Sequence, residues 1–272
     1  MTYEDFTALR IEVRDGIATL TIDHPPINLL DMALIGELER AGTALEADEA
    51  VRVVVLRSAN ADFFIAHADV TLIQMLPTTP PPKPTGLGPF HRMVDRFRTM
   101  PKATIGVVEG IARGGGSELL LSLDMRFAAL GRAVLAQPEV ALGIIPGGSG
   151  TQRLPRLVGR ARALEIILGC DDVPADLAER WGYVNRALPP AALWPFVDRL
   201  AARIASFPAG AIALAKEAVD AADTTVLDGL LAEADAFNRS LAAPDTQARM
   251  RRFMEAGGQT VEVEKAGLAK IT

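Results

Sequence analysis

A glycine-rich stretch, Gly110 to Leu121, constrains this chain more than any other segment. The apolar run from Thr104 to Val108 precedes it and is typical of a buried strand, and the apolar residues after Ser117 predict a helix. Glycines at a strand-to-helix junction let another molecule approach the backbone because no Cβ stands in the way. The first amides of a helix also carry partial positive charge. The stretch is therefore predicted to hold a negative charge beside Glu118, although a tight turn that starts a helix has the same composition.

Composition narrows the function classes. The chain has 272 residues, enough for one large domain or one domain with an appendage. Its net charge of −6 gives no electrostatic basis for binding nucleic acid. Three histidines and one cysteine, Cys170, do not form a metal-ligand pattern, so no metal is expected. No apolar run is long enough to span a membrane, and the acidic start lacks the apolar core of a secretory signal. A cytoplasmic protein is therefore expected.

Strand and helix signals alternate through the first two thirds of the chain, and recur loosely as strand, strand, helix. Residues 10–22 predict a hairpin around Asp15-Gly16, and Asp31 is placed to cap the helix that follows. The further predicted elements are a strand over 51–56, a core-closing loop over 63–70, a helix over 90–100, strands over 125–129 and 134–136, a turn at 137–139, a glycine-rich turn over 146–153 that opens a helix, a helix over 174–181, and a last strand over 183–185.

Two segments depart from this alternation. Residues 77–89 are rich in proline and are predicted to be irregular, either a flap or a linker. From about Pro189 the sequence is rich in Ala and Leu, and residues 191–256 predict three or four helices separated at Phe207-Pro208 and Ala243-Pro244. Because these helices carry so much apolar surface, we expect them to pack on the core or on another subunit.

Several motifs follow one another in a distinctive order: Pro25-Pro26-Ile27-Asn28, then residues 64–69, 101–102, 110–118, 137–139, 143–154 and 182–185. Their order and spacing resemble the crotonase, or enoyl-CoA hydratase/isomerase, superfamily. The resemblance runs from the hairpin to the helices near residue 253. It implies an α/β (α+β) fold, in which a crotonase-like spiral of ββα units forms a core over residues 1–190. Residues 191–272 would form a C-terminal helical trimerisation region, giving a homotrimer or homohexamer.

The resemblance also implies an acyl-CoA thioester substrate, a place in fatty acid metabolism, and no cofactor, since coenzyme A is part of the substrate. By position, the backbone N–H groups of Ala68 and Gly115 would form an oxyanion hole for the thioester carbonyl. Glu118 and Glu139 match the two glutamates of the family's hydratases. Glu118 would mainly position and deprotonate water, and Glu139 would mainly hand a proton to the α-carbon.

The remaining substrate contacts are also implied by the resemblance. Ala66 and Val70, on either side of Ala68, would offer backbone groups to the adenine of CoA. The full set of expected substrate-binding residues is Ala66, His67, Asp69, Val70, Gly114, Pro138 and Gly147. A lysine that is common in the family after residue 70 and a basic pair near residue 255 are absent, which leaves Lys83, Arg92 and Lys102 as candidates for contacts to the CoA phosphates.

Three residues depart from the family pattern near the predicted site. His67 stands where the family usually has glycine, and it would be strained if that position requires a positive φ. We expect its imidazole to be structural or to line the pocket. Arg113 replaces a small or apolar residue and Glu109 replaces an asparagine, so His67, Glu109 and Arg113 are candidates for a charged cluster.

The two matched glutamates favour an enoyl-CoA hydratase, which adds water syn across a trans-2-enoyl-CoA to give a 3-hydroxyacyl-CoA. A double-bond isomerase, which shuttles one proton with one glutamate and excludes water, is the nearest alternative. Other enolate chemistry, such as a hydrolase or a decarboxylase, also stays open. A rival from another class is a non-catalytic CoA-binding or scaffold protein, whose role would survive Glu118→Ala and Glu139→Ala.

Overall fold

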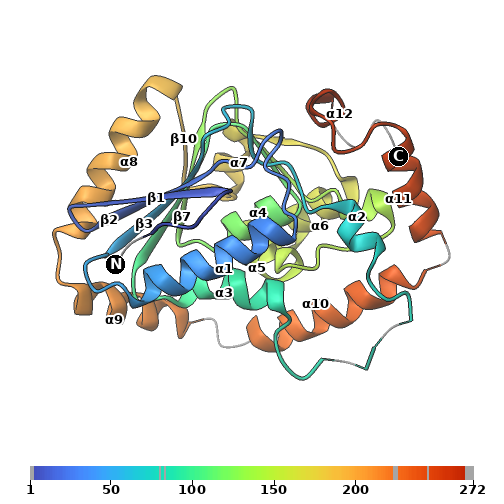
Figure 1. Cartoon of the computed structure of the whole chain (residues 1–272), viewed down its shortest axis with the longest axis horizontal. Helices are drawn as coiled ribbons and strands as arrows, with labels where there is room; N and C mark the ends of the chain where they lie inside the picture. Colours follow the sequence, from blue (N-terminus) through green and yellow to red (C-terminus); the bar gives the residue numbers. More distant parts are fainter. Residues whose placement is uncertain (1–2, 80, 83, 223–225, 244, 267–272) are drawn as a thin grey trace.

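Successive ββα units build the core of the molecule (Figure 1). The computed structural model describes residues 3–79, 81–82, 84–222, 226–243 and 245–266. Within these residues the units are β1 (Leu9–Arg14), β2 (Ile17–Ile22) and α1 (Met32–Ala47); β3 (Val53–Ser58), β4 (Phe63–Ile65) and α2 (Val70–Gln74); β5 (Ala103–Val108), β6 (Ile111–Arg113) and α4 (Gly115–Leu121); β7 (Met125–Ala129), β8 (Val134–Ala136) and α5 (Gly150–Val158). Helix α3 (Pro89–Thr99) joins the second unit to the third.

The units share two sheets, and this arrangement produces the predicted spiral. The described strands form a large sheet in the order β1-β2-β3-β5-β7-β10 and a small sheet in the order β4-β6-β8-β9, in which β9 is Val173–Pro174 and β10 is Arg186–Leu188. In the last three units the first strand enters the large sheet and the second enters the small sheet. Since β3, β5 and β7 run parallel, as do β4, β6 and β8, each unit advances in the same direction. The predicted α/β class and the spiral of ββα units are confirmed.

Local sequence explains several of these elements. The hairpin of β1 and β2 turns at Asp15-Gly16 as predicted, with Arg14 paired to Ile17. Asp31 caps α1, because its Oδ1 accepts the Leu34 N–H at 2.9 Å. Strand β5 is buried along its whole length, which its continuous apolar run predicted.

Several strands differ from the prediction. The last strand is β10, and residues 183–185 lie outside it. The Tyr183 hydroxyl is buried against the Ser117 hydroxyl, and Asn185 Oδ1 accepts the Arg126 N–H, so side chains fix this segment before the strand begins. Strands β4, β6 and β9 are not predicted, because two or three residues are too few to show a periodic pattern, and β4 lies in the segment expected to be a loop.

Helices complete the chain. After α6 (Arg160–Gly169) and α7 (Ala175–Trp181), residues 190–255 form α8 (Pro190–Ala205), α9 (Ala209–Asp220), α10 (Val226–Leu241) and α11 (Thr246–Glu255) in the described part of the chain. The predicted break at Phe207-Pro208 is confirmed, whereas Pro244 lies outside the described residues. A short further helix, α12 (Val261–Ala266), follows.

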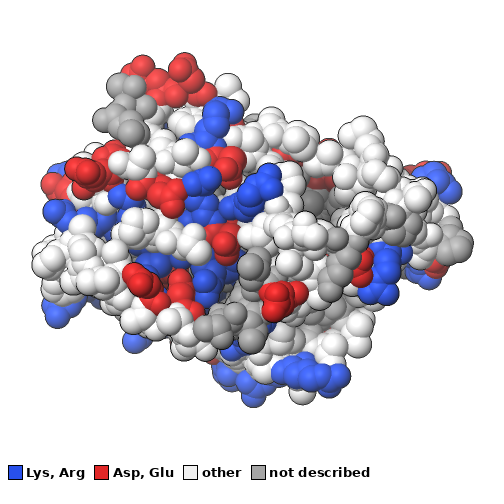
Figure 2. Space-filling model, turned by 90° about the horizontal axis from the view of Figure 1, so that it is seen from below, with Lys and Arg blue, Asp and Glu red and all other residues white. Residues whose placement is uncertain are grey.

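The C-terminal helices cover different sides of the core. Helix α8 packs on the large sheet, α10 lies against α5, and α11 lies against α2 (Figure 1). On the face shown in Figure 2, Lys and Arg side chains are interleaved with Asp and Glu. Among the residues that the structure describes, no helix is both long and apolar enough to cross a membrane.

Candidate active site

A cavity of about 480 Å³ lies between the glycine-rich turns of the core and the helices α10 and α11. It brings together the predicted residues Ala68, Gly115, Glu118, Glu139, His67, Val70, Gly114, Pro138 and Gly147. Ala66 and Asp69 do not line it. Ala66 is buried in a cluster with Ile27 and Phe63, and Asp69 caps α2 by accepting the Thr71 N–H.

The two predicted oxyanion-hole residues are neighbours in this cavity. Gly114, at φ +50°, turns the chain from β6 into α4, so Gly115 is the first helical residue and its amide has no partner within the helix. A Cβ on Gly115 would lie 3.5 Å from the Ala68 Cβ and 2.7 Å from Leu30 Cδ2, so the close approach requires glycine. An isolated β-bridge pairs Leu30 with Ala68: the Leu30 N–H donates to the His67 carbonyl oxygen, and the Asp69 N–H donates to the Leu30 carbonyl oxygen. The Ala68 N–H takes no part in this bridge.

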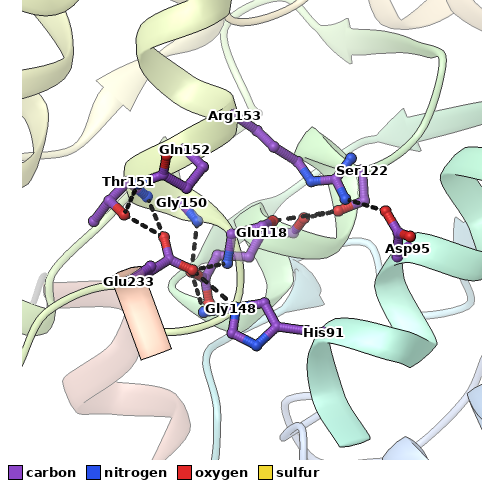
Figure 3. A network of polar contacts seen from close by, with 11 residues as sticks. His91, Asp95, Glu118, Ser122, Gly148, Gly150, Thr151, Gln152, Arg153 and Glu233 are labelled. Atoms are coloured by element: carbon purple, nitrogen blue, oxygen red, sulfur yellow. Dashed lines mark hydrogen bonds and ion pairs between the residues drawn. The ribbon is translucent and has the colours of Figure 1, made fainter. Parts of the chain in front are cut away.

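Glu118 sits in the first turn of α4 with its carboxylate buried. Its Oε1 accepts the Gly148 N–H at 2.7 Å and the Gly150 N–H at 2.9 Å, both from the turn that opens α5 (Figure 3). Burial, together with the nearby Glu139 and Glu233 carboxylates, holds the pKa of Glu118 well above its usual 4.5. The hydrogen bonds from the Gly148 and Gly150 N–H groups lower this pKa, because they stabilise the ionised carboxylate.

Glu139 begins a short 3₁₀ helix, η1 (Glu139–Leu142), that follows the predicted turn. Burial raises the pKa of Glu139 to about 8. Its Oε1 lies against the Gly114 turn, where a Cβ would approach it to 2.9 Å, and its Oε2 is buried without a partner among the described residues. The Glu118 carboxylate accepts hydrogen bonds from two backbone N–H groups, whereas Glu139 Oε2 accepts none. The arrangement therefore favours a proton on Glu139 and a negative charge on Glu118.

His67 is buried beside the cavity and is bonded at both ring nitrogens. Nδ1 lies 2.8 Å from the Ala68 carbonyl oxygen, and Nε2 lies 2.9 Å from Glu264 Oε1 on α12. Its backbone φ is not positive, so the strain that a positive φ would impose on a histidine does not arise. His67 lines the cavity.

The predicted charged cluster exists with different members. Arg113 is buried and donates to both carboxylate oxygens of Asp172 at 2.7 Å, and to the Glu264 carbonyl oxygen at 2.7 Å. Glu264 therefore joins Arg113 to His67. Glu109 does not belong to this cluster, because it faces Arg57 at 3.7 Å. Glu264 was missed, because nothing in its local sequence indicates a contact with residues so far away.

The three candidates for contacts to the CoA phosphates differ in their exposure and position. Lys102 is buried and donates to the Asp48 and Val51 carbonyl oxygens, so its predicted contact with phosphate is wrong. Arg92 is exposed and adjoins His91, which lines the cavity, so it stays a candidate. Lys83 lies outside the described residues. Within the described part of the chain, no group of three His, Cys, Asp or Glu side chains is placed to hold a metal ion.

Comparison with known proteins agrees with this fold. The family described as "Enoyl-CoA hydratase/isomerase" matches residues 12–262, and the chain belongs to this family, within the crotonase superfamily. It is 36% identical to a crotonyl-CoA hydratase of Syntrophomonas wolfei over 94% of this chain and 96% of that protein. It is 34% identical to a short-chain-enoyl-CoA hydratase of Clostridium acetobutylicum, over 90% and 94%.

Solved structures lead to the same family. The crystal structure of a putative enoyl-CoA hydratase from Streptomyces avermitilis superposes with a TM-score of 0.89 at 36% identity, and the match covers 98% of this chain and 99% of that one. An enoyl-CoA hydratase from Mycobacterium avium subsp. paratuberculosis gives a TM-score of 0.80 at 28% identity, over 92% and 97%.

Proposed function

We propose that this protein is an enoyl-CoA hydratase, which adds water syn across a trans-2-enoyl-CoA to give a 3-hydroxyacyl-CoA. The main support for the proposal is that one cavity is lined by Glu118, Glu139, Ala68 and Gly115. The backbone N–H groups of Ala68 and Gly115 are the proposed oxyanion-hole donors. Relatives with hydratase names at 34–36% identity support the same reaction.

In the proposed mechanism, the amides of Ala68 and Gly115 donate to the thioester carbonyl oxygen. As water attacks the β-carbon, that oxygen becomes an enolate oxygen, and losing one donor would cost about 3–4 kcal/mol of transition-state stabilisation. Glu118 starts ionised and takes the proton of the attacking water. Glu139 starts protonated and gives its proton to the α-carbon, so the product gains the hydroxyl of the water and the proton of Glu139. A proton then passes from Glu118 to Glu139 by way of solvent and restores the starting state.

The apolar part of the lining would hold the acyl chain and the pantetheine arm. Phe90, Leu142, Ile144, Phe237 and Phe253 line the cavity with the proposed catalytic groups. Ala66 and Val70 are expected to offer backbone groups to the adenine. Of these groups, the Val70 N–H is already occupied, because it donates to Gln259 Oε1 at 2.6 Å.

A cytoplasmic homotrimer or homohexamer completes the proposal. Helix α9 has no buried residue within this chain, and its Leu214 and Val219 side chains are 66% and 72% exposed. Such an apolar helix face is typical of a subunit contact. Residues 191–272 would thus serve assembly as well as the active site.

Crotonyl-CoA tests the proposed reaction. We expect the absorbance of the conjugated thioester to fall with the wild type and with Glu109→Gln, a control that removes a carboxylate outside the cavity. Glu139→Gln should abolish the change while still binding CoA esters. A 3-hydroxy product identified by mass would establish hydration. Conversion to a 3-enoyl-CoA without any hydroxy product would instead assign an isomerase, and binding without turnover of short, long or branched enoyl-CoAs would contradict both.

A further inference from the structure

Four consecutive backbone N–H groups, from the end of the turn before α5 and the first two residues of α5, are shared between two buried carboxylates. Gly148 and Gly150 donate to Glu118, as described above. Ser149 and Thr151 donate to the two oxygens of Glu233 at 2.6 and 2.7 Å. The amides thus alternate, and the turn that holds Glu118 is itself held on its other side by a residue of α10 (Figure 3).

The conformation of this turn needs external support. Ser149 has a φ of +104°, a region that residues with a Cβ rarely adopt, and its side chain is fully buried. A non-glycine residue persists there when surrounding contacts compensate for the strain. The bond from Ser149 N–H to Glu233 Oε1 is such a contact, and it lies between the two amides that bind Glu118.

Glu233 is fixed from several sides. It is 2% exposed, accepts the Thr151 hydroxyl hydrogen, and lies 3.0 Å from His91 Nε2 on α3. A fully bonded buried carboxylate of this kind is rigid, because each of its acceptor sites has a donor. The position of Glu118 therefore depends on a contact made by the C-terminal helices.

We propose that Glu233 is a positioning residue for Glu118: through the Ser149 and Thr151 amides it holds the neighbouring amides of Gly148 and Gly150 in the geometry that orients the Glu118 carboxylate toward the reacting water. The inference rests on the proposed hydratase function. It adds to that function a third carboxylate, which contacts neither substrate nor water.

The charges around Glu118 give a readout that a loss of stability alone would not produce. Glu139 and Glu233 both raise the pKa of Glu118. The other charged or titratable groups near Glu233 are His91 and Arg153, and Arg153 is paired with Asp95 at 2.9 Å. Removing the charge of Glu233 should therefore lower the pKa of Glu118 and move the acid limb of the kcat/KM profile to lower pH.

The chain contains a matched control. Glu37 on α1 accepts two backbone amides and a threonine hydroxyl, from Thr7 and Ala8, and it does not line the cavity. With crotonyl-CoA, we expect Glu233→Gln to lower kcat by about 10- to 100-fold, because a small displacement of a reacting group has effects of this size. KM should change little, and Glu37→Gln should retain the wild-type kcat. A wild-type kcat and pH profile in Glu233→Gln would overturn the proposal.

Two further measurements keep the proposal falsifiable. If Glu233→Gln does not fold, Glu233→Asp shortens the side chain and withdraws the carboxylate from the Ser149 and Thr151 N–H groups, and an unchanged kcat in that variant would contradict the proposal. If the wild type does not hydrate any enoyl-CoA, the proposed function fails. The positioning role of Glu233 can then still be tested by NMR, from the amide signals of Gly148 and Gly150 in ¹⁵N-glycine-labelled protein. Both signals should shift in Glu233→Gln and stay in place in Glu37→Gln, and unshifted signals would show that Glu233 does not set this turn.

Discussion

Glu264 lies 2.9 Å from His67, although the two residues are 197 positions apart in the chain. His67 directly precedes Ala68, and on the other side Val70 donates to Gln259. Gln259 N–H in turn donates to Glu264 Oε1 at 2.9 Å. The backbone that carries the proposed Ala68 donor is therefore attached on both sides to the segment that contains α12.

Glu264→Ala should destabilise the protein by about 1–3 kcal/mol, because it leaves buried donors on His67 and Gln259 without their acceptor. Urea unfolding measures this change. Glu262, on the same helix but exposed, provides the control, and Glu262→Ala should stay within about 0.5 kcal/mol of the wild type. Equal stability of the two variants would contradict a structural role of the buried cluster.

Ser149→Gly should stabilise the protein by about 1 kcal/mol, since glycine adopts a positive φ without steric cost. The Ser149 hydroxyl offsets little of this gain, because its neighbour Ser122 Oγ is 3.4 Å away. Thermal unfolding should show a higher Tm than the wild type. Ser206, which has an ordinary φ of −75°, is the control, and Ser206→Gly should lower the Tm. A lower Tm in Ser149→Gly would mean that the backbone is not strained at this residue.

The sequence predicted the spiral core well because its signals are local. The turn at Asp15-Gly16, the cap at Asp31 and the apolar run of β5 each depend on residues close together in the chain. Through the resemblance, it also predicted a site made of Glu118, Glu139, Ala68 and Gly115. All four residues line the cavity, whereas Ala66 and Asp69, which were expected there, do not. The sequence did not predict Glu233 or Glu264, because a buried glutamate on an amphipathic helix looks like a solvated one until its distant partner is known. The charged-cluster prediction included Glu109 because it is close to Arg113 in the sequence, which does not show that its side chain faces Arg57.

The raised pKa of Glu139 makes stability depend on pH. Between about 4.5 and about 8 the folded protein binds more protons at this group than the unfolded chain does, so the free energy of unfolding falls as pH rises. The loss of unfolding free energy caused by ionising Glu139 is absent below this range and complete above it. Each pKa unit corresponds to about 1.4 kcal/mol. Glu139→Gln should therefore gain stability over the wild type as pH rises from 5 to 9, as followed by Tm. A constant difference across this range, like that expected for Glu109→Gln, would refute the raised pKa.

Leu214→Glu should weaken the proposed assembly, because it places a charge on the exposed apolar face of α9. Sizing by light scattering should show a trimer or hexamer for the wild type and smaller species for the variant. Leu168 on α6 is similarly exposed, at 63%, and Leu168→Glu serves as the control that retains the assembly. A wild-type protein that is monomeric, or an assembly that Leu214→Glu leaves intact, would exclude α9 as the contact.

The cavity has a consequence for the order in which the protein matures. Its walls combine turns from the ββα core with Phe237 and Phe253 from the last helices, and Glu233 and Glu264 reach the same region from there. The ribosome releases these helices after the core. A nascent chain that ends before α10 can pair its central strands, yet it lacks a wall of the cavity and both distant carboxylates. Only a chain whose synthesis has passed Glu264 would therefore have the complete cavity that the proposed chemistry requires.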